Sequence, residues 1–116
     1  MVRLDEHWMG QDQVIQVSAL AQSTGYLSGE AVEIGAWQGL STIGIVTAIA
    51  PSVLHVVDHW KGDSESPEAI EQGLAIPAAC LERDNYQIFM DNMAEATAGN
   101  FQVHKMDYRE FLAQWS

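Results

Sequence analysis

The residues best suited to chemistry lie between Glu33 and Asp58. Gly35 and Gly39 permit turn conformations, or a close backbone approach, that a Cβ atom would obstruct. They join an expected strand to an expected helix, whose first N–H groups would face a crevice at the strand ends. Asp58 follows Gly39 by 19 positions, the spacing at which an acid reaches the ribose hydroxyls of a nucleotide cofactor. The pattern indicates a binding site for a cofactor that contains a nucleoside.

Each of these features also has an ordinary structural explanation. A glycine turn between a strand and a helix is common, and an acid after a strand is often a helix cap or a solvated turn residue. Glu33 adds an acid at the strand end, where a buried carboxylate without a role would be costly. We therefore favour a binding site. Trp37 stands where the dinucleotide fingerprint has its second glycine, so an enzyme that uses NAD is a less favoured alternative.

The elements that would position these residues alternate along the chain. Apolar periodicity, glycine stops and β-branched runs predict helices over 11–23, 40–50, 84–97 and 107–115, and strands over 31–34, 53–57 and 101–106. Alternation of this kind predicts an α/β, Rossmann-like fold, with a parallel sheet covered by helices on both faces. Three strands are few for such a sheet, so we expect it to be incomplete.

Two segments of the second half differ in how well they fit a pattern. Residues 61–82 follow no single period, which indicates a long loop with one short helix at most. Residues 84–97 have the clearest helical periodicity, with Gly99 at the C-cap position. The apolar stripe of this helix consists of Tyr86, Phe89, Met90, Met93, Ala94 and Thr97.

Length and charge limit the classes of protein to consider. The 116 residues, 47% hydrophobic and 18% charged, suit one globular domain. We expect residues 1–116 to form a single, partial domain, into which a helical segment over 1–29 leads. A formal charge of −11 repels nucleic acid and anionic membrane surfaces, so we expect neither as a partner.

The sequence also indicates a compartment. It has one cysteine, Cys80, which cannot form an intrachain disulfide and lies in an apolar run typical of a buried residue. The N-terminus lacks the apolar core of an export signal, and the apolar region from Ile43 to Val57 is too interrupted for a membrane span. We expect a cytoplasmic protein.

A short pattern opens with Glu33-Ile34-Gly35 and continues with Gly39, Ser41-Thr42 and Asp58. It resembles the class I S-adenosylmethionine-dependent methyltransferases, in the branch similar to macrocin-type O-methyltransferases. The stretch from Val57 to Asp63 is also similar to the Asp-x-Trp-Lys-Gly-Asp segment of some bacterial members.

The resemblance implies a position for the residues of the turn around S-adenosylmethionine. Glu33 would hold the amino end of the methionine portion. The turn from Gly35 to Gly39, with Ala36 and Trp37 inside it, would pass beneath that portion. Ser41 and Thr42 would open the helix next to the cofactor.

The same resemblance implies positions around the nucleoside. Asp58 would accept hydrogen bonds from the ribose hydroxyls, and His59 and Trp60 would flank the adenine. Asp107 and Tyr108 would approach the exocyclic amine, although Asp107 as a simple helix cap is an equally good interpretation.

No catalytic or metal-binding residue can be assigned from the sequence. His55, His59 and His104 lack the compact helical spacing of a zinc motif, so we expect no metal site. None of the residues is a convincing general base. The expected activity is methyl transfer to a small-molecule acceptor, for which this chain supplies the cofactor-binding half. The alternative is a nucleotide- or cofactor-binding module, or subunit, without catalysis.

The resemblance finally implies a larger sheet, of seven strands, with the first strand near its middle. The three expected strands would lie in the order three, two, one, so the strand over 31–34 would become an open edge. An unprotected apolar edge invites pairing with another chain. We therefore expect self-association through this edge, and no catalysis by the isolated monomer.

Overall fold

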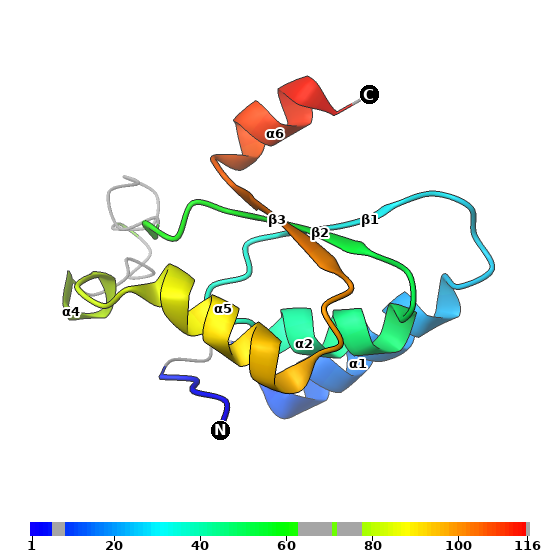
Figure 1. Cartoon of the computed structure of the whole chain (residues 1–116), viewed down its shortest axis with the longest axis horizontal. Coiled ribbons are helices and arrows are strands. Elements are labelled where there is room, and N and C mark those ends of the chain that lie inside the picture. The colour runs from blue at the N-terminus through cyan, green and yellow to red at the C-terminus, as the bar shows by residue number, and fades with distance from the viewer. Residues whose placement is uncertain (6–8, 63–70, 72–77, 116) are drawn as a thin grey trace.

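A parallel sheet of three strands forms the centre of the part of the chain that the structure describes (Figure 1). The structure is a computed structural model and describes residues 1–5, 9–62, 71 and 78–115. Its strands are β1 (Ala31–Ile34), β2 (Leu54–Asp58) and β3 (Phe101–Lys105), in the order β1-β2-β3. In the parallel register, Leu54 of β2 lies between Ala31 and Phe101. The α/β class and the expected strand order are confirmed.

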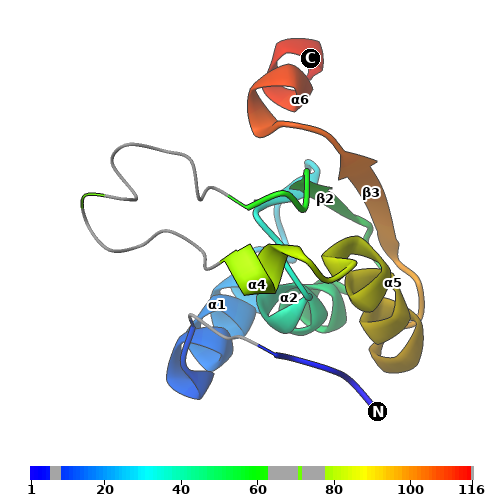
Figure 2. The same cartoon turned by 90° about the vertical axis from the view of Figure 1, so that its left-hand side faces the viewer.

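Helices cover both faces of this sheet. On one side lie α1 (Gln11–Ser23), α2 (Leu40–Ile49) and α5 (Asn85–Ala96), and on the other side lies α6 (Tyr108–Gln114), as both views show (Figures 1 and 2). A short helix, α4 (Ala78–Leu81), precedes α5. The two-sided covering expected of a Rossmann-like sheet is therefore confirmed.

Local capping explains where several helices begin. The Asp84 carboxylate accepts a hydrogen bond from the Gln87 N–H at 3.1 Å and starts α5. Asp107 caps α6 in the same way. Such caps satisfy backbone donors that have no partner within the helix. The helix and strand bounds lie within two residues of those predicted from the sequence.

The hydrophobic core lies between the sheet and the layer of α2 and α5. Parallel strands are buried on both faces, and β2 accordingly buries Leu54, Val56 and Val57 almost completely. The buried core cluster consists of Ala36, Val46, Leu54, Val56, Trp60, Phe89 and Met93. This cluster includes a residue of the glycine turn and a residue that follows β2, so the core reaches the edge where the strands end.

The buried face of α5 differs in part from the predicted stripe. Phe89 and Met93 are buried as expected, but Ala94 is exposed, so its place on the stripe is wrong. Asn85 and Asn92 are buried instead. These amides have hydrogen-bond partners in distant segments of the chain, which is why a pattern of apolar residues does not find them.

Two further expectations concern the loop and the membrane. Of the loop predicted over 61–82, the structure describes residues 61, 62, 71 and 78–82, and α4 is a short helix within it. The rest of that loop, with Asp63 of the resemblance, lies outside the described residues. Among the helices that are described, none has the length and apolar character needed to cross a membrane.

Candidate functional site

The glycine turn leaves β1 and enters α2 through three residues with left-handed backbone. Gly35 has φ of 87°, Trp37 of 48° and Gly39 of 99°. Glycine adopts such angles at little cost, but a tryptophan does so only where its surroundings hold it. A Cβ atom added at Gly39 would lie 3.3 Å from Cδ2 of Phe89. Both glycines are therefore needed by the conformation of the turn, as the sequence predicted.

Asp58 holds this turn from the neighbouring strand. Its Oδ2 atom accepts hydrogen bonds from the N–H groups of Ala36 and Trp37, both at 2.9 Å. Its Oδ1 atom accepts from the Trp60 N–H at 2.8 Å. The side chain is 12% exposed. Asp58 thus lies at the predicted strand end, but its carboxylate already binds three backbone donors of this chain.

Trp60 supports the turn from the core. Its indole N–H donates to the carbonyl oxygen of Trp37 at 2.6 Å, and its ring centroid lies 4.9 Å from that of Tyr86 and 5.0 Å from that of Phe89. Only 7% of Trp60 is exposed, which leaves little indole surface for a ligand. Its contact with an adenine stays a prediction, and its supporting role was not found from the sequence.

Glu33 lies beside the first turn of α2. The Ser41 hydroxyl donates to Oε2 at 2.6 Å, and the Thr42 hydroxyl donates to Oε1. Burial raises the pKa of the Glu33 carboxyl above its ordinary value, the two hydroxyl hydrogen bonds oppose this, and the charge of Asp58 adds to it. Glu33, Ser41 and Thr42 are thus brought together as one group, at the end of β1.

Asp107 begins α6, close to the end of β3. Its carboxylate accepts hydrogen bonds from the Arg109 N–H at 2.8 Å and from the guanidinium at 2.9 Å. These contacts hold the pKa of Asp107 well below its usual range, mainly through Arg109. The Arg109 guanidinium carbon also lies 5.7 Å from the ring centroid of the exposed Tyr108. Asp107 therefore acts as a helix cap here, and its approach to an adenine amine stays a prediction.

His59 lies beside Asp58, just after the end of β2. Its Nδ1 atom is 3.9 Å from Oδ1 of Asp58 and accepts a hydrogen bond from the Lys61 N–H at 2.9 Å. The ends of β2 and β3 lie side by side, because Asp58 is paired with Lys105 in the parallel register. The structure therefore gathers Glu33, Asp58, His59 and Asp107 at one edge of the sheet.

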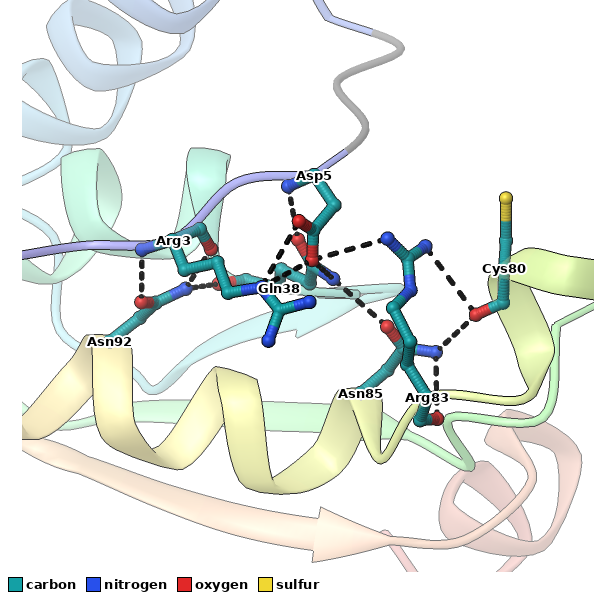
Figure 3. A network of polar contacts seen from close by, with 7 residues as sticks. All are labelled: Arg3, Asp5, Gln38, Cys80, Arg83, Asn85 and Asn92. Atoms are coloured by element: carbon teal, nitrogen blue, oxygen red, sulfur yellow. Dashed lines mark hydrogen bonds and ion pairs between the residues drawn. The ribbon is translucent and has the colours of Figure 1, made fainter.

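Gln38 is the site residue that sequence reasoning missed. It is 1% exposed and follows the strained Trp37. Its side chain contacts Asp5 and Asn85, as Figure 3 shows, and its carbonyl oxygen accepts from Asn92 at 2.8 Å. A glutamine in a turn gives no local signal of burial, because its partners are 33 to 54 residues away in the sequence.

The acids at this edge limit the ligands that it can accept. Asp58 already accepts from the N–H groups of Ala36 and Trp37, so these two donors of the turn are not open to an anion. The carboxylates of Glu33 and Asp58 would repel a pyrophosphate and attract a cation or hydroxyl donors. The arrangement suits a neutral or cationic polar ligand better than a phosphate.

The described residues offer no metal centre, since no group of three His, Cys, Asp or Glu side chains within them could hold an ion. His55 and His104 instead contact each other under α6, with Nδ1 and Nε2 3.0 Å apart. The pair packs against Phe111 and Trp115 of the α6 region. We interpret these histidines as structural.

No protein-family model matches the chain, and no curated protein matches it either. The geometry of the turn and of the strand ends is therefore the evidence from which a function can be inferred.

Proposed function

We propose that this chain binds S-adenosylmethionine at the glycine turn and takes part in transfer of its methyl group to a small-molecule acceptor. The observation that supports this most is the occupation of the turn N–H groups of Ala36 and Trp37 by the Asp58 carboxylate. A pyrophosphate at this turn would lack those two donors and would face the negative charge of the Asp58 carboxylate. S-adenosylmethionine has no phosphate and has a positively charged sulfonium and ammonium, which suit an acidic edge.

In this proposal the two acids bind different parts of the ligand. Glu33 accepts the ammonium of the methionine portion, because its oxygens keep acceptor capacity beside the Ser41 and Thr42 hydroxyls. Asp58 accepts one ribose hydroxyl through the single lone pair that its three backbone hydrogen bonds leave, on Oδ1. His59 lies on the adenine side. An acceptor atom then bonds to the methyl carbon while the carbon–sulfur bond breaks, and the acceptor loses a proton to a base that we do not assign.

We propose that the protein acts in the reducing cytoplasm, a compartment that suits a chain with a single cysteine and no intrachain disulfide. We also propose that copies associate through β1. This strand has one neighbour in the described sheet, and Val32 and Ile34 are 37% and 49% exposed. Pairing of two such edges would cover both the free backbone groups and these side chains.

Ligand-dependent thermal stability tests the binding proposal. S-adenosylhomocysteine should raise the melting temperature, because a ligand that binds only the folded state stabilises it by RT ln(1 + [L]/Kd). NAD should not. Glu33→Gln should lose most of the shift, whereas Glu30→Gln, which changes an exposed acid just before β1, should keep it. A folded wild type with no shift at millimolar S-adenosylhomocysteine would refute the proposal.

The alternative without catalysis is decided by turnover. The wild type and the Asp58→Asn variant are each incubated with S-adenosylmethionine and a pool of candidate hydroxyl and amine acceptors. The wild type should release S-adenosylhomocysteine faster than the variant does. Binding with no turnover under any acceptor would favour a cofactor-binding module or subunit.

A further inference from the structure

The N-terminal residues Arg3 and Asp5 lie in an extended segment across α5 and the glycine turn (Figure 3). The side-chain amide of Asn92 forms two hydrogen bonds with the backbone of Arg3: it accepts from the Arg3 N–H at 2.7 Å and donates to the Arg3 carbonyl oxygen at 2.6 Å. Gln38 accepts from the Asp5 N–H at 2.7 Å. Side-chain amides thus bind this segment as they would bind an extended peptide.

Gln38 is the point where this segment meets the turn. Its amide nitrogen donates to Asp5 Oδ2 at 3.1 Å and to Asn85 Oδ1 at 2.9 Å. The Arg83 guanidinium lies 3.2 Å from the same Asp5 oxygen. A buried amide is costly unless it is hydrogen-bonded, so the Gln38 side chain stays in the interior because Asp5 and Asn85 satisfy it.

The turn is therefore constrained from two sides. Asp58 binds the N–H groups of Ala36 and Trp37, and the N-terminal segment binds Gln38, the next residue. Trp37 has a left-handed φ of 48°, a conformation that persists only where neighbouring contacts determine it. Losing one of the two constraints should let the turn leave this conformation more often.

We propose that residues 3–5 form a latch that sets the conformation of the glycine turn, with Asp5, Gln38 and Asn92 as positioning residues. Within the described part of the chain, the polar contacts of residues 3–5 are with Gln38, Arg83, Asn92 and one another, and none of them is with Glu33 or Asp58. The latch controls ligand affinity by holding the Ala36 and Trp37 N–H groups against Asp58. This part of the inference rests on the proposed function, whereas the effect on the turn does not.

Amide hydrogen exchange of the whole chain tests the latch without a ligand. Asp5→Ala removes the carboxylate that contacts Gln38, Arg83 and the Arg3 guanidinium, and it changes no residue of the hydrophobic core. We expect the Ala36 and Trp37 amides to exchange about tenfold faster, relative to the amides of β2, because local opening then costs less. Asn92→Ala should act in the same direction, since it releases both Arg3 and Gln38.

The matched control is Asp91→Ala. Asp91 is exposed on α5 and also accepts from a glutamine amide, that of Gln87, at 2.9 Å. It has the same charge as Asp5 but no contact with the turn, so exchange at Ala36 and Trp37 should not change. If both latch variants leave these two amides unchanged, or accelerate them only in step with β2, the proposal is wrong.

Affinity for S-adenosylhomocysteine then connects the latch to the site. Asp5→Ala should raise the Kd about tenfold, the effect of one lost hydrogen bond to a charged group, and Asp91→Ala should leave it unchanged. A wild type that does not bind would refute the proposed function, while the exchange data would still decide the latch. Normal affinity in a variant whose turn amides open faster would refute control of binding by the latch.

Discussion

The glycine turn and the outer edge of β1 are only a few residues apart in sequence, yet they are built in opposite ways. At the turn, Glu33 and Asp58 have hydrogen bonds on every carboxylate oxygen, and Gln38 is buried. At the edge, Val32 and Ile34 expose apolar surface beside an outer strand. Directional polar contacts specify one conformation, whereas apolar surface specifies burial but not a partner. Changes at one region should therefore leave the other unaffected.

The largest effect is expected from Asp58→Ala. The change removes the acceptor of three backbone N–H groups, those of Ala36, Trp37 and Trp60. These donors are partly buried, so we take the low end of the cost of an unpaired donor, about 1 kcal/mol each, and expect a loss of about 3 kcal/mol in the free energy of unfolding. Asp58→Asn keeps one acceptor oxygen and should therefore lose less of the free energy of unfolding than Asp58→Ala does. Urea denaturation measures both variants. A loss below about 1 kcal/mol for Asp58→Ala would show that Asp58 does not hold the turn.

Next in size is Gly39→Ala, compared with Gly99→Ala. Both glycines have left-handed φ angles, 99° and 88°, and a side chain in that conformation costs about 1 to 2 kcal/mol. They differ in space: a Cβ atom at Gly39 would lie 3.3 Å from Phe89, and one at Gly99 has nothing within 4 Å. Gly39→Ala should therefore destabilise the protein more, and only this variant should weaken S-adenosylhomocysteine binding. If Gly39→Ala and Gly99→Ala changed the Kd for S-adenosylhomocysteine equally, the glycine turn would not be part of the binding site.

Much of the fold follows from local sequence, and much of the site does not. The short segment Ala31–Ile34, which ends at Gly35, and the segment Gln11–Ser23, which is followed by Gly25, predict β1 and α1 to the residue. Glycine spacing likewise locates the turn. The buried state of Asn85 and Asn92 could not be predicted, because it depends on Gln38 and Arg3, up to 89 residues away. Two of the three backbone partners of Asp58, Ala36 and Trp37, could not be predicted for the same reason, since they lie 22 and 21 residues away in the sequence.

A smaller effect with a definite pH dependence is expected from Glu33→Gln. The pKa of Glu33 is raised in the folded protein, mainly by burial. Its contribution to stability is thus fully present below the ordinary pKa of 4.5 and is lost as the pH rises through the raised value. The glutamine has no charge to bury and can still pair with the Ser41 and Thr42 hydroxyls.

Glu33→Gln should therefore gain stability over the wild type as the pH rises from 4.5 to neutral, while it loses ligand binding. Thr42→Val removes one hydroxyl that stabilises the charge, so it should make the loss of stability with pH steeper. Melting temperatures recorded across this range measure both effects. If the difference in melting temperature between Glu33→Gln and the wild type stayed constant with pH, burial would not raise the pKa of the Glu33 carboxyl.

The smallest effect on stability is expected at the edge, from Ile34→Lys. Ile34 is 49% exposed, and substitutions at exposed positions usually change stability by about 0.5 kcal/mol or less. A lysine on an edge strand opposes pairing with another chain, so self-association should fall while the Kd for S-adenosylhomocysteine stays the same. Val53→Lys is the matched control, because Val53 is 48% exposed but lies just outside β2. Both variants change the net charge from −11 by one positive unit, so a difference between them cannot come from charge repulsion.

Light scattering after size-exclusion chromatography, over a range of concentrations, gives the oligomeric state. A monomeric wild type, or equal association in both variants, would show that β1 does not form the interface. A loss of ligand affinity in Ile34→Lys alone would show that the turn and the edge are coupled after all.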